Sequence, residues 1–184
     1  MDALDALHQR SSVPKLTEPL PSQEMLENIY KAAFRAADHA VLRPWRFLVI
    51  KESARERLGE LFVEAGLAND PELAPAAVEK LRAKPQRAPL ILVCISSYKP
   101  HPKVPELEQD LSAGAATQNM LLAAFAQGLG AMWRTGSLAY NQTVKDGLGL
   151  CETEKIIGFL YIGTIDGGTK QLCDVDIDAY FKDW

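Results

Sequence analysis

Residues 110–128 read Asp-Leu-Ser-Ala-Gly-Ala-Ala-Thr-Gln-Asn-Met-Leu-Leu-Ala-Ala-Phe-Ala-Gln-Gly, and this stretch decides the fold. Its composition predicts one long helix over 111–127, with Asp110 as the N-cap and Gly128 just beyond the last turn. A helix of that length spans about 25 Å. Because most of its faces are apolar, we expect it to lie at the centre of the molecule, with the other elements around it.

Short apolar runs on both sides of this helix predict the strands of one sheet. The clearest run is 90–95, Leu-Ile-Leu-Val-Cys-Ile. Shorter runs predict strands over 47–50, 132–134 and 156–162, the last interrupted by Gly158. The regular β-α-β rhythm of a doubly wound parallel sheet is absent, so the pattern indicates an α+β sandwich built as one domain over 1–184.

Cap and stop residues predict the other helices. Asp2 and Ser22 are expected to cap the first two, and the second carries an apolar stripe that ends near Arg35. Three more helices are expected over 53–66, 75–84 and 141–147, and Ser53 is expected to cap the first of them. The tail 174–184 is mixed in character, and we expect its apolar residues Tyr180, Phe181 and Trp184 to anchor it.

Composition excludes several classes of function. The formal net charge of −4 and the pI of about 5.4 give no electrostatic footprint for nucleic acid or for an anionic membrane. The N-terminal residues lack the pattern of a secretory signal, and no apolar run approaches the ~20 residues of a membrane span. We therefore expect a cytoplasmic protein. The three cysteines form no Cys-x-x-Cys pair, and Cys94 is expected to be a buried, inert thiol.

The best-known nucleotide and catalytic motifs are missing. Gly128-Leu129-Gly130 follows a helix and has Trp133 where the dinucleotide fingerprint needs glycine. There is no Gly-Lys-Ser/Thr loop, no His-Glu-x-x-His and no Gly-x-Ser-x-Gly. The three histidines have no metal-ligand spacing, so we expect no metal site. If the protein performs redox chemistry, a cofactor has to supply it.

Three polar clusters are candidates for holding such a cofactor. Arg10-Ser11-Ser12 combines a planar guanidinium with two hydroxyls, which is the donor set that a phosphate monoester needs. Gly128 to Ser137 has glycines that permit close backbone approach, and Arg134-Thr135 supplies a second donor set of the same type. Each cluster also has a simpler interpretation as a solvated turn or a helix stop.

The third cluster, 35–47, lies between a helix and a strand. Asp38 is placed to orient His39 within it. Arg43 precedes Pro44 and is therefore expected to have an extended backbone. The simpler interpretation here is a charged helix end followed by a capped loop.

Five segments identify a family resemblance. They read Asp2-Ala-Leu with Arg10-Ser-Ser, Ala37-Asp-His with Arg43-Pro-Trp-Arg-Phe47, Ser112-Ala-Gly114, Ala126-Gln-Gly-Leu-Gly130 with Trp133-Arg-Thr-Gly136, and Gly158-Phe-Leu-Tyr-Ile-Gly163. In this order they resemble the nitroreductase family, in particular its short, YdjA-type members. The resemblance covers nearly the whole chain. It implies an α+β fold with a mostly antiparallel sheet flanked by helices, and a domain-swapped homodimer with two FMN molecules at the subunit interface.

The resemblance also implies roles for particular residues. Arg10, Ser11 and Ser12 would hold the FMN phosphate and ribityl chain, and Trp133, Arg134 and Thr135 would complete the phosphate side. Arg35 and His39 would reach FMN, one or both from the second subunit. The stretch that matches the family's NAD(P) contact is Ala123, Ala124, Phe125, Ala126, Gln127 and Gly128.

The implied activity is an NAD(P)H-dependent, FMN-dependent reduction of nitroaromatics, quinones or related small acceptors by ping-pong hydride transfer. No side chain is needed as a nucleophile, and Arg10 or Arg35 is the candidate cation near the pyrimidine edge of the flavin. His39 is a hydrogen-bonding contact or a proton donor. Two departures from the family pattern, Gln9 before Arg10 and Arg43 before Pro44, leave the acceptor open. An alternative is an FMN-binding protein that stores or senses the cofactor without turnover, and a third is a structural dimer without cofactor.

Overall fold

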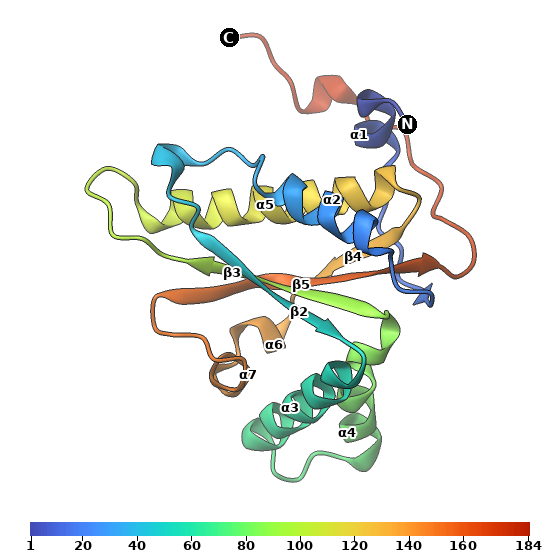
Figure 1. Ribbon diagram of the computed structural model, residues 1–184, viewed down its shortest axis with the longest axis vertical. Coiled ribbons are helices and arrows are strands. Elements are labelled where there is room, and N and C mark those ends of the chain that lie inside the picture. Colours follow the sequence, from blue (N-terminus) through green and yellow to red (C-terminus); the bar gives the residue numbers. More distant parts are fainter.

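Strand β3 (Leu90–Ser97) runs through the middle of the molecule, between β2 (Trp45–Lys51) and β5 (Glu154–Ile165), in a computed structural model that describes residues 1–184 (Figure 1). Strand β4 (Gly130–Arg134) pairs with β5, and the two-residue β1 (Leu16–Thr17) pairs with the last residues of β5. Every pairing is antiparallel. The expected α+β class with an antiparallel sheet is confirmed.

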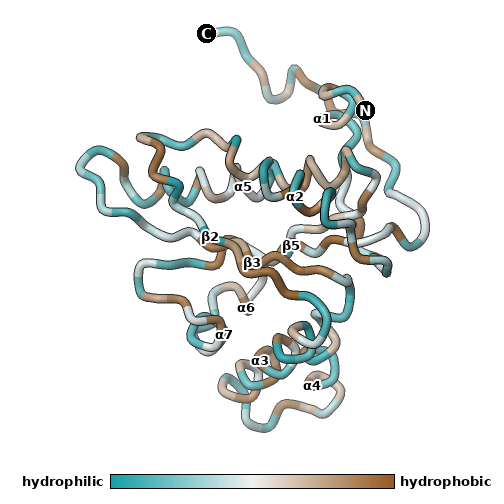
Figure 2. The backbone as a smooth tube through the Cα atoms, in the orientation of Figure 1, coloured by the Kyte–Doolittle hydropathy of each residue, from teal (hydrophilic) through white to brown (hydrophobic).

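The apolar run in β3 is continuous because both faces of the strand are covered. Alternate residues point to opposite faces, so Leu90, Leu92 and Cys94 enter one core while Ile91, Val93 and Ile95 enter the other. Figure 2 shows that hydrophobic residues are concentrated in β2, β3 and β5. Cys94 is buried as expected, and burial raises the pKa of its thiol to about 12.

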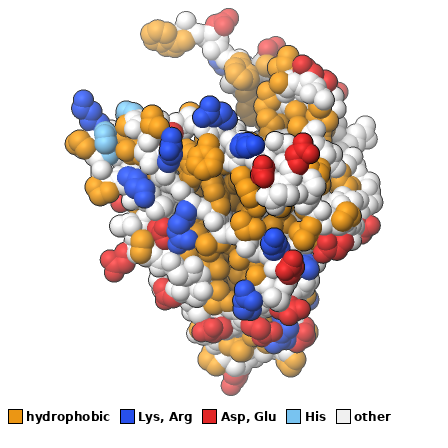
Figure 3. Space-filling view, in the orientation of Figure 1, with side chains coloured by type: hydrophobic (Ala, Val, Ile, Leu, Met, Phe, Trp, Pro, Cys, Tyr) orange, Lys and Arg blue, Asp and Glu red, His pale blue; other side chains and the backbone are white.

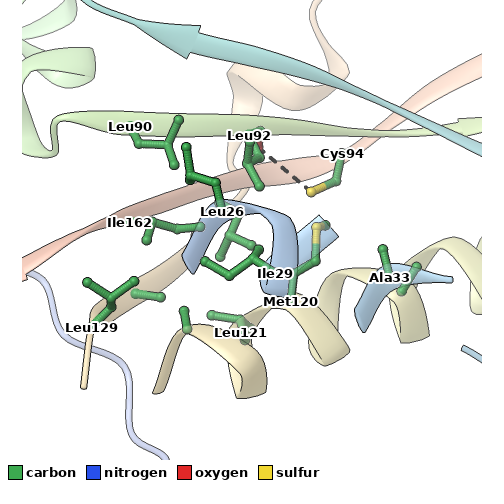
Figure 4. Close-up of a cluster of buried hydrophobic side chains, with 14 of the residues drawn as sticks. Leu26, Ile29, Ala33, Leu90, Leu92, Cys94, Met120, Leu121, Leu129 and Ile162 are labelled. Atoms are coloured by element: carbon green, nitrogen blue, oxygen red, sulfur yellow. Dashed lines mark hydrogen bonds between the residues drawn. The ribbon is translucent and has the colours of Figure 1, made fainter. Parts of the chain in front are cut away.

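Helices α2 (Gln23–Ala33) and α5 (Glu106–Ala126) cover one face of the sheet. In the close-up, Leu26 and Ile29 of α2 and Met120 of α5 point toward Leu92 and Ile162 (Figure 4). Ile29, Leu92 and Ile162 are fully buried. The long helix therefore lies over the sheet as the principal element of this core.

The second face of the sheet is covered by a group of shorter elements. Phe62 of α3 (Ser53–Asn69) packs edge-on against Phe159 of β5, with ring centres 5.5 Å apart. The other elements on this side are α4 (Pro75–Arg82), the 3-10 turn η2 (Lys84–Arg87), α6 (Ser137–Tyr140) and α7 (Gln142–Gly147).

The start of α5 corrects one expectation. The helix begins at Glu106, after Pro105, and Asp110 lies inside it rather than at its N-cap. The Asp110 carboxylate instead accepts a hydrogen bond from the Tyr98 hydroxyl at 2.8 Å. The expected end is confirmed, since Ala126 is the last helical residue and Gly128 has a positive φ of 79°.

The first two helix caps are confirmed. The Asp2 carboxylate accepts from the amide of Leu4 in α1 (Ala3–Gln9), and the Ser22 hydroxyl accepts from the amide of Met25. In α3 the expected cap is wrong, because Ser53 is the first helical residue and Glu52 takes the cap position with a φ of 52°. No helix is both long and apolar enough to cross a membrane.

Both chain ends lie at the same end of the molecule, where α1 and the C-terminal tail extend beyond the body (Figure 1). The tail contains only the 3-10 turn η3 (Ile177–Ala179). Tyr180 is 77% exposed and Phe181 76% exposed, and Trp184 is fully exposed. The expectation that these residues anchor the tail is therefore wrong within one chain, because all three side chains are largely exposed.

Candidate functional site

Strand β4 carries Trp133 and Arg134 and pairs with β5. Trp133 is paired with Leu160, and Arg134 is paired with Phe159. The Trp133 indole N–H donates to the Ile157 carbonyl oxygen at 3.2 Å. A Cβ at Gly158 would overlap that indole nitrogen, so only glycine lets the ring lie so close to β5.

Arg134 points into a cavity of about 330 Å³. Its guanidinium lies over the Tyr161 ring, 5.4 Å from the ring centre, and its Nε is buried without a hydrogen-bond partner. Lys84 and Arg87 of η2 also line this cavity. Burial lowers the pKa of Arg134, and the nearby charge of Arg87 lowers it further. Trp133 and Thr135 line the same cavity, so this predicted set lies together.

The segment Arg10-Ser11-Ser12 lies near the same strand. It follows α1 directly, and the next residue, Val13, donates its amide to the Ala131 carbonyl oxygen of β4 at 3.0 Å. All three residues are partly buried. One guanidinium nitrogen of Arg10 is buried without a hydrogen-bond partner. Arg10 does not line the cavity of Arg134, so the chain holds two separate guanidinium groups with unused donors.

Arg35 lies in a different place. It borders an apolar groove of about 530 Å³ between α1, α2 and α5, together with Leu7 and Ala123. Its Nε donates to the neighbouring Phe34 carbonyl oxygen at 3.1 Å. The side chain is on the surface and keeps its other donors free for a ligand or a second chain.

The loop 38–44 corrects two expectations. His39 Nδ1 lies 2.7 Å from Glu108 Oε2 of α5, so Glu108 orients His39, and Asp38 does not. The Asp38 carboxylate accepts instead from the amide of Arg43 at 2.6 Å. Arg43 itself has a φ of 48° rather than an extended backbone, because the hydrogen bond of its amide to Asp38 holds the turn against the preference imposed by Pro44.

The predicted NAD(P) stretch at the end of α5 is partly core. Ala124 is fully buried, and Gln127 is held by its Nε2, which donates to the Met25 and Ala123 carbonyl oxygens. Only Ala123 and Ala126 of this stretch line the groove that contains Arg35.

Within one chain, the predicted residues do not form one site. Glu108, which holds His39, lies near the start of α5, whereas Ala123 lies near its end and contacts the groove beside α1. These two helix positions are about 22 Å apart at 1.5 Å per residue. His39 and the α1 end of the molecule therefore cannot surround the same ligand in a single subunit.

Sequence reasoning missed Lys84, Arg87 and Tyr161. Lys84 and Arg87 belong to no motif, and Tyr161 lies in the segment 158–163, to which no site role was assigned. Only the pairing of β3 and β4 with β5 brings these residues to Arg134. A weak signal was present, since Lys84 and Arg87 are two basic residues directly before the clearest apolar run. No group of three His, Cys, Asp or Glu side chains is arranged to hold a metal ion.

Comparison with known proteins then decides the family. The Nitroreductase family model matches residues 7–164. The chain belongs to the nitroreductase family. This nitroreductase is 42% identical over 164 residues to the protein named "Putative NAD(P)H nitroreductase YdjA" from Escherichia coli K12, and the match covers 89% of this chain and 88% of that protein.

Solved structures agree with the fold of this nitroreductase. The nitroreductase-like family protein from Bacillus cereus superposes with a TM-score of 0.85 at 22% identity, covering 99% of this chain and 95% of that one. A nitroreductase with bound FMN from Bacteroides fragilis gives a TM-score of 0.73 at 20% identity, covering 97% of each chain.

Proposed function

We propose that this nitroreductase is an FMN-dependent oxidoreductase that uses NADH or NADPH to reduce small acceptors such as nitroaromatics or quinones. The observation that carries the proposal is the pair of buried guanidinium nitrogens, one on Arg10 and one on Arg134, that have no partner in the protein. Buried polar groups normally have partners, so these two fit an anionic ligand. Family membership and the FMN-bound neighbour from Bacteroides fragilis support FMN as that ligand.

The donor set suits a flavin phosphate. Arg10, Ser11 and Ser12 offer a guanidinium and two hydroxyls, and Arg134 with Thr135 offers another guanidinium and hydroxyl. Charge-assisted bonds from guanidinium to phosphate are roughly twice as strong as neutral ones. Arg10, Ser11 and Ser12 would hold the phosphate and the ribityl chain, and Arg134 and Thr135 would complete the phosphate side, although Arg10 and Arg134 border separate spaces within one chain. Trp133 would provide an aromatic surface beside the cofactor.

His39 would come from a second subunit. Because His39 lies at the opposite end of α5 from α1, we assign it to the site of the neighbouring subunit in a homodimer, whereas Arg35 borders the groove beside α1 of its own chain. Glu108 holds His39 Nδ1, which leaves Nε2 as the ring atom that contacts the ligand. Arg35 or Arg10 would stabilise negative charge on the reduced flavin.

FMN, when bound, would supply the chemistry of hydride transfer from NAD(P)H to the acceptor. The protein residues bind and orient the reactants, and none of them acts as a nucleophile. Ala123 to Gly128 would contact the nicotinamide cofactor, with Ala123 and Ala126 as the accessible members. We place the reaction in the cytoplasm.

The absorbance spectrum of the purified protein tests this function. We expect bound FMN that is bleached by NADH or NADPH and recovers its colour when an acceptor such as a quinone is added. Arg10→Ala should weaken FMN binding at least tenfold, since a buried charge-assisted contact is worth about 1.5–3 kcal/mol. Arg57→Ala, an exposed residue on α3, is the matched control. A protein that stays colourless with excess FMN would contradict the proposal.

The same measurement separates turnover from storage. A storage or sensing protein would hold FMN but oxidise NAD(P)H slowly in the presence of every acceptor. Rapid multiple turnover with any one acceptor excludes that alternative.

A further inference from the structure

The cavity beside Arg134 is lined by three cations and no carboxylate. Lys84 and Arg87 come from η2 and Arg134 from β4, and these three lie among apolar walls such as Phe62 and Phe159. No acidic side chain is among the lining residues, although acidic residues outnumber basic ones in the chain, 24 to 20. The cavity is therefore locally positive, although the net charge of the whole chain is negative.

Three other partly buried arginines of the chain have partners. Arg46 binds the Glu154 carboxylate with two nitrogens, and Arg55 donates to the Ala88 carbonyl oxygen. Arg82 binds Glu60 and Glu79. Lys84, Arg87 and Arg134 differ, because their side chains make no hydrogen bond and no ion pair.

Leaving these charges together is costly for the folded chain. Burial lowers the pKa of Lys84, and the charges of Arg87 and then Arg134 lower it further. The face of the Tyr161 ring partly offsets the positive charge of the Arg134 guanidinium above it. The Nε–H of Arg134, which lies in the plane of the guanidinium, has no hydrogen-bond partner. A cluster of cations with free donors and no counter-charge is the arrangement that an anion completes.

We infer that Lys84, Arg87 and Arg134 form a binding site for a phosphate-type dianion on the α3 side of β4. In this inference Lys84 and Arg87 extend the proposed flavin site. The inference rests on the proposed function only if the bound phosphate is the phosphate group of FMN. A free phosphate compound would use the same three cations. Three positive charges match a group that carries close to two negative charges near pH 7.

Binding of inorganic phosphate to the purified protein tests the inference without relying on enzyme activity. We expect phosphate to raise the thermal unfolding midpoint above its value in chloride at equal ionic strength, because a ligand of the folded state stabilises it. Calorimetric titration should give a dissociation constant for phosphate. Arg87→Gln and Lys84→Gln should each weaken it about tenfold, one charged contact being lost.

The variants carry their own folding control. Removing one of several mutually repelling cations should leave the unfolding midpoint in chloride unchanged or higher, while the rise caused by phosphate is lost. Arg57→Gln, which removes an exposed charge from α3, should bind phosphate like the wild type. If Lys84→Gln and Arg87→Gln bind phosphate as tightly as Arg57→Gln, or if the wild type binds none, the inference is wrong.

A second titration identifies the source of the phosphate. If saturating FMN displaces inorganic phosphate and Arg87→Gln also weakens FMN binding, the flavin phosphate occupies the site. If phosphate still binds to the FMN-saturated protein, the site takes a separate phosphate compound. Both results support the anion site, and neither depends on turnover.

Discussion

At the scale of single residues, the contact between Gly158 and Trp133 limits what the sequence can tolerate. A Cβ on residue 158 would overlap the Trp133 indole and lie 3.0 Å from the Arg134 carbonyl oxygen. Both neighbours are fixed by the pairing of β4 with β5. We expect Gly158→Ala to lower the free energy of unfolding by about 1–3 kcal/mol, as overpacking does, when measured by urea denaturation.

Gly168→Ala is the control for this prediction, since a Cβ there meets nothing within 4 Å. It should leave the free energy of unfolding within about 0.5 kcal/mol of the wild type. Because the displaced indole borders the proposed cofactor site, Gly158→Ala should also bind FMN more weakly. Equal stability of the two variants would contradict the contact.

Glu154 predicts how stability depends on pH. Its side chain is buried and accepts from Arg46 Nε at 2.6 Å and Nη2 at 2.7 Å, which lowers the pKa of Glu154 to about 2. A carboxyl whose pKa falls on folding stabilises the protein above its unfolded pKa. That contribution is lost as pH falls from about 4.5 toward 2. It amounts to about 2 kcal/mol after screening, because each pKa unit is worth about 1.4 kcal/mol and the Arg46 side chain is 35% exposed.

Glu154→Gln should remove this pH dependence. At pH 7 the variant should unfold more easily than the wild type, because Arg46 loses its partner, and the two stabilities should converge at low pH. Glu152→Gln, on the exposed neighbouring turn, should follow the wild-type curve. Parallel curves for the wild type and Glu154→Gln between pH 5 and 2.5 would refute the assignment.

At the scale of elements, several local signals could be read from the sequence, although the caps expected at Asp110 and Ser53 were wrong, and pairing between distant strands could not be read. The Asp2 and Ser22 caps and the end of α5 at Gly128 depend on neighbours within a few residues, and all three could be predicted. The two-residue β1 was missed because it exists only through pairing with β5. Likewise, β5 begins at Glu154, earlier than its apolar run, since its first residues are paired with β3.

The candidate site shows the same division. Arg10 and Arg134 could be selected by residue type and motif, and both keep unused donors in the structure. Lys84 and Arg87 could not be selected, because the residue they face, Arg134, is distant in sequence. His39 shows the opposite case, since its acidic neighbour in sequence, Asp38, is not its partner, and Glu108, which is distant in sequence, is.

At the scale of the whole molecule, the exposed apolar residues predict a homodimer. Leu4 and Leu7 of α1 are 61% and 58% exposed, and Tyr180, Phe181 and Trp184 of the tail are also exposed. The space-filling view shows hydrophobic side chains at this end of the molecule (Figure 3). We expect light scattering after size exclusion to give twice the chain mass of 20.3 kDa. Replacing the three aromatic tail residues with serine should shift the protein toward monomer and reduce bound FMN, because the proposed site needs both subunits.

Leu67→Ser is the control for the dimer, since Leu67 is an exposed apolar residue of α3, far from the tail in sequence. It should keep the dimer mass. A wild-type protein that is monomeric and still holds FMN would show that one chain builds the whole site.

Strand β5 joins the beginning of the chain to its end, because its residues pair with β1, β3 and β4. All three partner strands precede β5 in the chain, so a nascent polypeptide on the ribosome has them before their common partner strand. The sheet can close only once β5 has been synthesised, and until then the apolar β3 depends on chaperones or on α2 and α5 to avoid aggregation.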